Sequence, residues 1–246
     1  MSAATAGWLI DWPPRGRRTT ADRSGVPRVP VKAVIFDAYG TLVRNEGLRR
    51  IPQRIVADHG LSARAEDVFD AWIDRYSEAT QRPPFRTLRE IQPEILGQVL
   101  HALGVDADAA PYVELFFEAT TKVEHYPEVP EVLRALGAVR TAIVSNADSE
   151  HIAAWSFSLP VEFIVISEGI RAYKPDPLVF RTALERLGLE AHEVLHVGDS
   201  DVDDVKGAKA AGLRVAWLNR EGRPRRRDVP RPDFEIRDLK ELPSLL

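Results

Sequence analysis

The run Val34-Ile35-Phe36-Asp37-Ala38-Tyr39-Gly40-Thr41-Leu42 decides how this chain folds. A short apolar, β-prone segment stops at the carboxylate Asp37, and a glycine turn and a hydroxyl residue follow directly. In a parallel α/β sheet, ligands bind at the carboxyl ends of the strands. We therefore expect Asp37 at the mouth of an active site, where a carboxylate serves as nucleophile, base or metal ligand.

Composition limits the classes of protein to which the chain can belong. Its 246 residues suffice for one large domain or for a core with an insertion. The net charge of −4, from 33 basic and 37 acidic residues, argues against a nucleic-acid binder. The absence of cysteine excludes disulfides, thiol catalysis and thiolate metal sites. No apolar run approaches the roughly 18 residues of a membrane helix, so we expect a cytoplasmic protein that binds neither nucleic acid nor membrane.

Hydrophobic periodicity divides the chain into three parts. Residues 1–30 are rich in Ala, Thr, Arg, Pro and Gly and have no regular period, which is typical of a flexible leader. Between residues 48 and 123, apolar side chains recur at helical spacing and no strand pattern interrupts them. We predict a helical cap domain at 45–125, inserted into a core domain formed by 31–44 and 126–246.

Strands and helices alternate through the predicted core. This alternation favours a doubly wound parallel sheet, an α/β fold with a Rossmann-like core. We expect strands at 31–36, 139–144, 163–166, 194–197, 213–218 and 234–236, and helices at 130–136, 177–187 and 202–211.

Polar residues follow the core strands and can meet at one edge of the sheet. Ser145 and Asn146 end one strand and are suited to holding an anionic group. Lys174, in the loop after the next strand, can neutralise charge that builds on a nucleophile. Asp199 to Asp204 concentrate negative charge, and Mg²⁺ is the natural hard cation for such oxygens. Asp203 and Asp204 are also compatible with a simpler role, as acids favoured at a helix N-terminus.

These four segments, in this order, resemble the motifs of the haloacid dehalogenase superfamily. The resemblance extends from about Val31 to Leu218, and the helical insertion is similar to that family's cap. It implies Asp37 as nucleophile, Thr41 as support for its loop, Ser145 as second-motif hydroxyl with Asn146 beside it, Lys174 as third-motif base, and Asp199 with Asp204 as fourth-motif acids. It further implies Mg²⁺ held by Asp37, the backbone carbonyl of Tyr39, Asp199 and Asp204. Asp203 stands where many relatives carry Asn, so whether Asp203, Asp204 or both support the metal stays open.

Tyr39 is the main departure from the phosphatases of that family, which carry a second Asp at this position. A phenol of pKa about 10 is a poor acid–base catalyst near neutrality, and losing such help costs about 10²–10⁴ in rate. The Asp-Ala-Tyr-Gly-Thr-Leu wording resembles instead the 2-haloacid dehalogenases, in which attack on carbon expels halide without a proton. That branch generally lacks the Gly198-Asp199 pair and uses no metal. It holds halide with a cap arginine, and no motif assigns that role to Arg49, Arg50, Arg75 or Arg86.

The chain therefore combines a dehalogenase-like first motif with a phosphatase-like fourth motif. We predict a hydrolase acting on a small anionic molecule, first a Mg²⁺-dependent phosphatase for a small phosphorylated metabolite, with Tyr39 among its site residues. The alternatives are a metal-independent 2-haloacid dehalogenase, and a catalytically weak binding or regulatory protein on the same fold. If the cap supplies an acid, His59, His101 and His125 are candidates, with His125 the best placed. The oligomeric state, monomer or homodimer, stays open.

Overall fold

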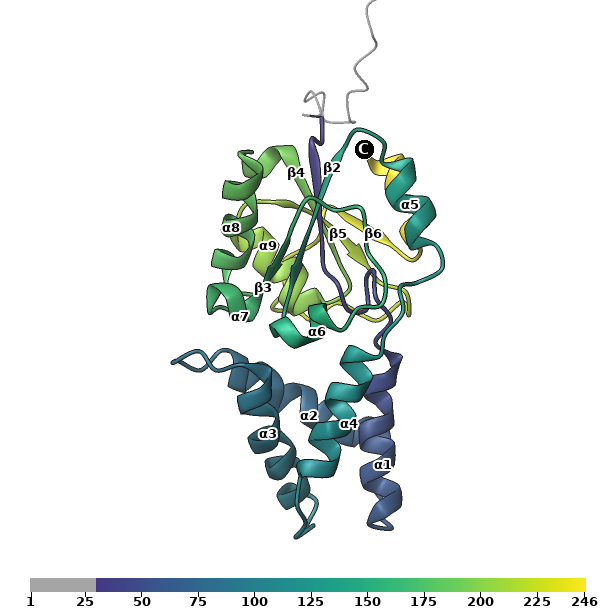
Figure 1. The fold of residues 1–246 in the computed structure, drawn as a ribbon, viewed down its shortest axis with the longest axis vertical. Coiled ribbons are helices and arrows are strands. Elements are labelled where there is room, and N and C mark those ends of the chain that lie inside the picture. The colour runs from purple at the N-terminus through teal and green to yellow at the C-terminus, as the bar shows by residue number, and fades with distance from the viewer. Residues whose placement is uncertain (1–29) are drawn as a thin grey trace, which may run out of the picture. The chain divides into compact units, whose positions relative to one another are not determined.

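A single sheet of six parallel strands, in the order β3-β2-β1-β4-β5-β6, organises the structure (Figure 1). The structure is a computed structural model that describes residues 30–246, so nearly all of the predicted leader lies outside the described residues. The strands are β1 Ala33–Phe36, β2 Arg140–Ser145, β3 Ile164–Ile166, β4 Val194–Gly198, β5 Arg214–Leu218 and β6 Phe234–Ile236. All six expected strands are present, and the α/β fold class is confirmed.

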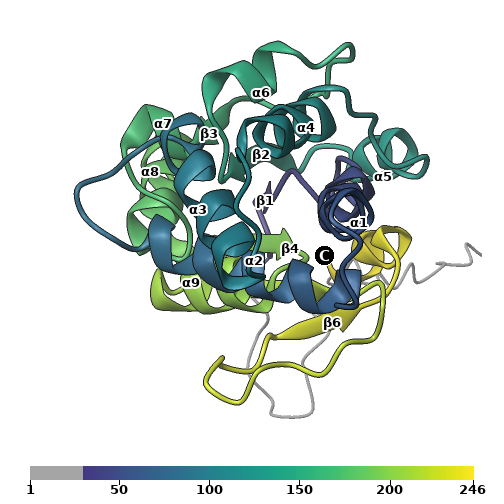
Figure 2. The same cartoon turned by 90° about the horizontal axis from the view of Figure 1, so that it is seen from below.

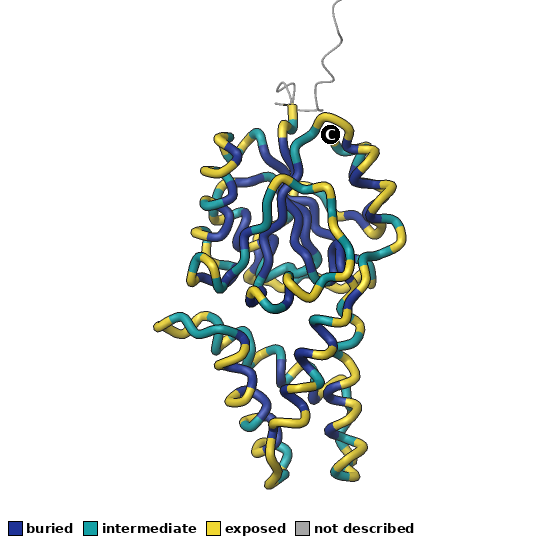
Figure 3. The backbone as a smooth tube through the Cα atoms, in the orientation of Figure 1, coloured by how far each residue is buried: buried dark blue, intermediate teal, exposed yellow. Residues whose placement is uncertain are grey.

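Burial of both sheet faces explains why the strand sequences are almost entirely apolar. In β1, Val34 and Phe36 belong to one hydrophobic cluster, whereas Ala33 and Ile35 belong to another. This alternation follows from the two-residue period of a strand. Figure 3 shows the central strands as the most continuously buried part of the backbone. Only a parallel sheet covered on both sides makes such a run entirely apolar.

Helices cover the two faces. On one face lies α5 Val129–Ala135, and on the other lie α8 Pro177–Leu187 and α9 Gly207–Ala210 (Figure 1). Two short helices, α6 Ser149–Ala153 and α7 Ser167–Ile170, follow β2 and β3.

The predicted helix at 202–211 differs from expectation at its start. Asp201–Lys206 forms a π-helical turn before α9 begins at Gly207. The wider turn places the Asp204 side chain beside Gly198, where an added Cβ would lie 2.1 Å from the Asp204 carboxyl carbon. Single π turns of this kind are frequent at functional sites, and this one brings the Asp204 carboxylate against β4, where it contacts His196.

Four of the five α-helices between β1 and β2 lie in the region where the sequence predicts a helical insertion. They are α1 Arg50–Asp58, α2 Ala65–Thr80, α3 Leu88–Ala102 and α4 Ala110–Thr121, and we call them the cap helices. Figure 2 shows α2, α3 and α4 in front of the sheet when it is viewed from its carboxyl edge. They have a hydrophobic cluster of their own, which includes Ile51, Trp72, Ile95 and Phe116. In the described part of the chain, no helix combines the length and apolar character needed to cross a bilayer.

Two backbone linkers join the cap helices to the sheet, and they run side by side. Val43 pairs with His125, the Arg44 amide donates to the Glu124 carbonyl, and the Tyr126 amide donates to the Leu42 carbonyl. We propose that residues 45–125 act as a separate cap domain, because they enter and leave the core through this one double connection.

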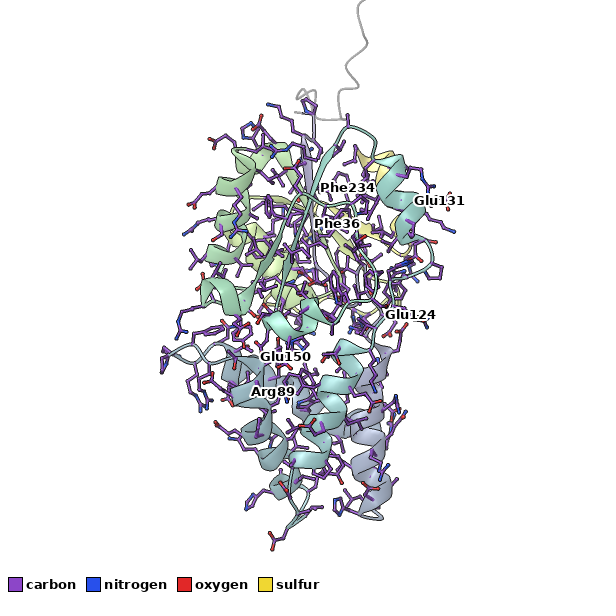
Figure 4. The ribbon with its side chains drawn as sticks, in the orientation of Figure 1. Phe36, Arg89, Glu124, Glu131, Glu150 and Phe234 are labelled. Carbon is purple, nitrogen blue, oxygen red and sulfur yellow. The ribbon has the colours of Figure 1, made fainter. Side chains whose placement is uncertain are left out.

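A second contact ties the start of α3 to the loop after β2. The Asp148 carboxylate accepts hydrogen bonds from the Leu88 and Arg89 amides at 3.0 and 2.9 Å. The Arg89 guanidinium also pairs with Glu150, and Figure 4 shows these two side chains facing each other across the boundary. The free N–H groups at the N-terminus of α3 are therefore partly satisfied by a core carboxylate.

Candidate active site

Asp37 and Lys174 form the centre of the site. Asp37 directly follows β1, beside β4, where the strand order reverses and α/β folds place their ligands. The Lys174 ammonium donates to Asp37 Oδ1 at 2.6 Å and to Asp204 Oδ1 at 2.7 Å. All three side chains are buried, and Lys174 is only 2% exposed. Burial alone would lower the pKa of Lys174, but Asp204 and Asp37 raise it above its ordinary value, so it stays charged.

Asp204 is the most fully satisfied carboxylate of the site. Besides Lys174, its Oδ1 lies 3.0 Å from His196 Nε2, and its Oδ2 accepts from the Ser200 amide at 3.0 Å. Burial opposes ionisation of Asp204, yet Lys174 and His196 hold its pKa below the usual range. Asp204 therefore holds the Lys174 ammonium in position. His196 is fully buried within β4.

Asn146 positions the backbone of Lys174. Its Oδ1 accepts from the Lys174 amide at 2.7 Å, and its Nδ2 donates to the Lys174 carbonyl at 3.2 Å. Ser145, the last residue of β2, is buried and lines the cavity described below. Thr41 is buried outside that cavity, and its hydroxyl has no hydrogen-bond partner among the described residues.

Three carboxylates come together at the sheet edge. Asp37, Asp199 and Asp204 each place one oxygen within 4.8 Å of the others. Gly40, with φ of +90°, makes room for them, since a Cβ at this position would lie 2.3 Å from Asp199 Oδ2. Burial, and then the neighbouring carboxylates, raise the pKa of Asp199 well above its ordinary value. Burial likewise raises the pKa of Asp37 despite the opposing effect of Lys174.

These oxygens fit Mg²⁺. Asp37 Oδ2 is buried without a partner, and the excess of negative charge is the kind that a hard divalent cation relieves. Asp203 lies at the same edge, and burial raises its pKa to about 7. One oxygen of its carboxylate lies 3.5 Å from Asn146 Nδ2. Asp203 therefore lines the cavity, but it is not one of the three carboxylates of the cluster. The backbone carbonyl of Tyr39 remains a predicted ligand.

The Tyr39 hydroxyl is already used as a structural link. It donates to the Thr120 carbonyl in α4 at 2.9 Å and accepts from Trp155 Nε1 at 3.2 Å. Burial raises the pKa of Tyr39 to about 12. Because its proton is engaged and held tightly, the phenol is not a usable acid for a leaving group.

A cavity of about 160 Å³ opens beside Asp37, between the cap helices and the sheet edge. The core contributes Asp37, Tyr39, Ser145, Asn146, His151, Lys174, Asp199, Ser200, Asp203 and Asp204, and the cap side contributes Leu48, Trp72, Ile73, Tyr76, Leu88, Gln92, Phe116 and Thr120. Reactive polar groups therefore lie on the sheet side, and the opposite wall is mostly apolar.

The histidines expected to supply an acid lie elsewhere. His59 Nε2 lies 2.9 Å from the Tyr112 hydroxyl, His101 is exposed on α3, and His125 Nδ1 lies 2.9 Å from the Tyr126 carbonyl. None of them lines the cavity, and neither do the four cap arginines considered for halide binding. The histidine that does line it is His151, in α6 of the core. The only sequence signal for it was its position six residues after the end of β2.

Comparison with known proteins identifies the family. A model of haloacid dehalogenase-like hydrolases matches residues 31–212, which span most of the chain. The chain belongs to this family. It is therefore a hydrolase of the haloacid dehalogenase superfamily, and the resemblance seen in the sequence is confirmed.

Members with two different activities resemble this hydrolase. (S)-2-haloacid dehalogenase 1 of Pseudomonas sp. (strain CBS-3) is 28% identical over 228 residues, covering 88% of this chain and 97% of that protein. N-acylneuraminate-9-phosphatase of Mus musculus is 25% identical and covers 88% and 95%. A defluorinating L-2-haloacid dehalogenase of known structure superposes with a TM-score of 0.68 at 27% identity, over 93% of this chain and 99% of that one.

Proposed function

We propose that this protein is a Mg²⁺-dependent phosphatase acting on a small phosphorylated metabolite, with Asp37 as nucleophile. The observation that carries the proposal is the position of Asp199, whose carboxylate joins those of Asp37 and Asp204 within 4.8 Å. A site for carbon–halogen attack has no need of this additional, half-buried carboxylate. Asp37, Asp199 and Asp204 would hold the cation, which when bound supplies charge neutralisation at the phosphoryl oxygens.

Phosphate transfer would take place in two steps. The Asp37 carboxylate attacks phosphorus through one of its oxygens while the bond to the alcohol oxygen breaks, giving an aspartyl phosphate and an alkoxide. Lys174 stays beside Asp37 and offsets its charge, and Ser145 and Asn146 line the same cavity. Water then attacks phosphorus and releases phosphate and the Asp37 carboxylate. The two protons of that water end on the alcohol and on phosphate.

The state of the Tyr39 hydroxyl limits which alcohols can leave from the phosphate ester. Since the Tyr39 proton is donated to Thr120 and its pKa is about 12, no side chain at this position protonates the alkoxide. Turnover should therefore be fastest for phosphate esters of acidic alcohols, and it should fall steeply as the alcohol becomes more basic.

The test is hydrolysis of p-nitrophenyl phosphate, with magnesium and with chelator. We expect activity only with magnesium, loss of about 10³-fold or more in Asp37→Asn, and loss of the magnesium response in Asp199→Asn. Asp201→Asn is the matched control, because Asp201 accepts from the Arg226 amide and lies outside the cavity. A rate of hydrolysis that changes neither with chelator nor in Asp199→Asn would contradict the proposal.

Dehalogenation of a 2-haloacid is the second candidate, favoured by Tyr39 and by the similarity to (S)-2-haloacid dehalogenase 1. Attack by Asp37 on carbon would expel halide and form an alkyl ester, and water would then attack the Asp37 carbonyl carbon. In heavy-oxygen water this route labels Asp37, whereas water attack on phosphorus leaves Asp37 unlabelled. Halide release from (S)-2-chloropropionate in chelator, with label in the Asp37 peptide, would establish dehalogenation and overturn the phosphatase proposal.

A further inference from the structure

Two residues that line the apolar half of the cavity carry a buried nitrogen atom without a hydrogen-bond partner among the described residues. The atoms are Gln92 Nε2 in α3 and His151 Nε2 in α6. Gln92 is 0% exposed and His151 is 1% exposed, so bulk water does not satisfy either atom. Buried polar groups are almost always paired in folded proteins, so two unpaired nitrogens on residues of one cavity wall indicate that this wall is suited to a ligand with an acceptor oxygen.

The orientation of the Gln92 amide is fixed by its neighbour. Trp72 Nε1 donates to Gln92 Oε1 at 3.1 Å. An indole nitrogen is a donor only, so the oxygen must face Trp72 and the NH₂ group must be the free end. Trp72 is itself held edge-on against Phe116, with ring centroids 5.9 Å apart. Gln92 therefore offers two N–H bonds that nothing in the described structure accepts.

The proton of His151 is placed by the same kind of argument. His151 Nδ1 lies 3.1 Å from the Asp148 amide nitrogen and 3.3 Å from the Asp148 carbonyl oxygen. We assign the shorter contact as the hydrogen bond, in which Nδ1 accepts from the amide and the neutral ring carries its proton on Nε2. Burial lowers the pKa of His151 and keeps the ring neutral. The aromatic rings of Tyr39, Phe116 and Phe117 surround it. His151 thus presents a second N–H donor to the cavity.

We propose that Gln92 and His151 form an oxygen-binding subsite for the part of the substrate that Asp37 does not attack. The ligand class is a compact apolar group, about the size of one aromatic ring, that carries a carbonyl or similar acceptor oxygen. The cavity of about 160 Å³ supports this size, since an engineered apolar cavity of about 150 Å³ binds benzene. The inference rests on the proposed function for the attacked end, where the phosphate would lie beside Asp37.

Most residues around the two donors are apolar, so we expect the acceptor oxygen to be carried by a largely apolar group. Trp72, Ile73, Leu88 and Phe116 line the same space and would be poorly matched to a sugar or a charged chain. The Tyr39 and Thr120 hydroxyls, which also line this space, are already committed, since Tyr39 donates to the Thr120 carbonyl and Thr120 donates to the Phe116 carbonyl. Gln92 and His151 would therefore be the donors that distinguish an oxygen-bearing group in this half of the cavity.

The test uses two neutral probes of similar shape, acetophenone and isopropylbenzene, which differ by a carbonyl oxygen in place of a methyl group. We expect the wild-type protein to bind acetophenone about tenfold more tightly, because the carbonyl satisfies buried donors. The preference should disappear in Gln92→Met and weaken in His151→Asn, which retains an acceptor for the Asp148 amide but has no atom at the Nε2 position. Calorimetry or ligand-observed NMR measures both dissociation constants.

Two further variants keep the result interpretable. Gln92→Met leaves Trp72 Nε1 without an acceptor, so the double variant Gln92→Met/Trp72→Phe removes both partners and should also lose the preference. Gln98→Met changes an exposed glutamine of the same helix and should leave the preference intact. Equal binding of the two probes by the wild type, no binding of either, or a preference that survives in both Gln92 variants would overturn the subsite.

The probes carry no phosphate, so their binding does not depend on the chemistry at Asp37. If p-nitrophenyl phosphate is not hydrolysed but acetophenone is preferred, the subsite stands and the proposed function fails. If phosphate esters are hydrolysed, kcat/KM for 4-oxopentyl phosphate should exceed that for 4-methylpentyl phosphate by about tenfold in the wild type. Equal values for the two esters would overturn the subsite and leave the phosphatase proposal standing.

Discussion

At the scale of single residues, Lys174 determines whether the site is stable. Its ammonium lies between the buried carboxylates of Asp37 and Asp204, at 2.6 and 2.7 Å. A buried ion pair adds little net stability, but removal of one partner leaves uncompensated charge in a low-dielectric interior. We therefore expect Lys174 to matter for stability as well as for the proposed chemistry.

Lys174→Met should lower the free energy of unfolding by about 3–5 kcal/mol and abolish hydrolysis. The carboxylates left behind are destabilising when charged, so the stability of this variant should recover as the pH falls and they take up protons. Lys206→Met is the control, since Lys206 pairs with Asp228 at an exposed site and should change stability by about 1 kcal/mol or less. Urea titrations at several pH values measure both. Equal losses in the two variants would contradict this view of Lys174.

For Tyr39 we expect a substitution to affect the stability of the protein more than its catalytic rate. Tyr39→Phe removes the hydrogen bond to the Thr120 carbonyl and leaves Trp155 Nε1 without its acceptor. We expect a loss of about 1–3 kcal/mol in unfolding free energy and a kcat within about tenfold of wild type, because general acid catalysis, which is worth about 10²–10⁴, is absent already. A drop in kcat of that larger size, with a changed pH profile, would make the phenol an acid after all.

The residues at the sheet edge could be placed from the sequence, and the wall of the cavity could not. Asp37 and Asp199 directly follow strands and Ser145 ends one, so the parallel sheet alone brings them to one edge. Gln92 and His151 reach the cavity because of the way helices α3 and α6 pack against that edge. Helical periodicity shows which residues are buried, but it does not distinguish burial in the cap's own core from burial against a ligand.

At the scale of elements, the Asp148 carboxylate is one of the groups that join the cap to the core. Asp148, in the loop after β2, accepts from the first amides of α3 at 3.0 and 2.9 Å. It supplements Thr87, the N-cap of this helix, from about 60 residues away in sequence. We expect this contact to help fix the position of α3, and with it the position of Gln92 in the cavity.

Asp148→Ala should destabilise the protein by about 1–2 kcal/mol and raise KM more than it lowers kcat, because α3 loses its register on the core. Hydrogen exchange should increase at the start of α3. Asp108→Ala is the matched control, because the Asp108 carboxylate accepts from the Ala110 amide at the start of α4, within the cap itself. If both variants change KM equally, Asp148 does not set the substrate-binding geometry.

Element positions were predictable where burial was two-sided, and less so near the site. The strands were placed within a few residues, because a covered parallel sheet forces long apolar runs. The short helices α6 and α7 were missed, since four or five residues carry too little periodicity to register. The π-helical turn at Asp201–Lys206 was predicted as ordinary helix, because the contact of Asp204 with His196 of β4 that accompanies the turn cannot be read from helical periodicity.

At the scale of the whole molecule, all five tyrosines have a raised pKa. Burial is the first cause for each of them, and it brings the pKa of Tyr39 and of Tyr126 to about 12. They lie in the cap helices, at the linkers and in the core, where Tyr173 stacks on Phe85 of the cap side at 4.9 Å between ring centroids. Alkaline pH therefore acts on every part of the described chain at once.

The sign of this effect is fixed by linkage. Below pH 10 the phenols are neutral in both states, and tyrosine contributes nothing to the pH dependence of stability. Above about pH 10 the unfolded chain releases these protons while the folded chain retains them, so the unfolding free energy falls as the pH rises. We expect no tyrosinate absorbance in the native protein near pH 10, then one cooperative step that coincides with loss of helical circular dichroism. In denaturant all five should titrate near 10. If tyrosinate appears near pH 10 while the helical signal is intact, a tyrosine of the cap or the linkers is exposed to solvent. The cap would then pack on the core less closely than the Tyr39–Thr120 and Tyr173–Phe85 contacts require.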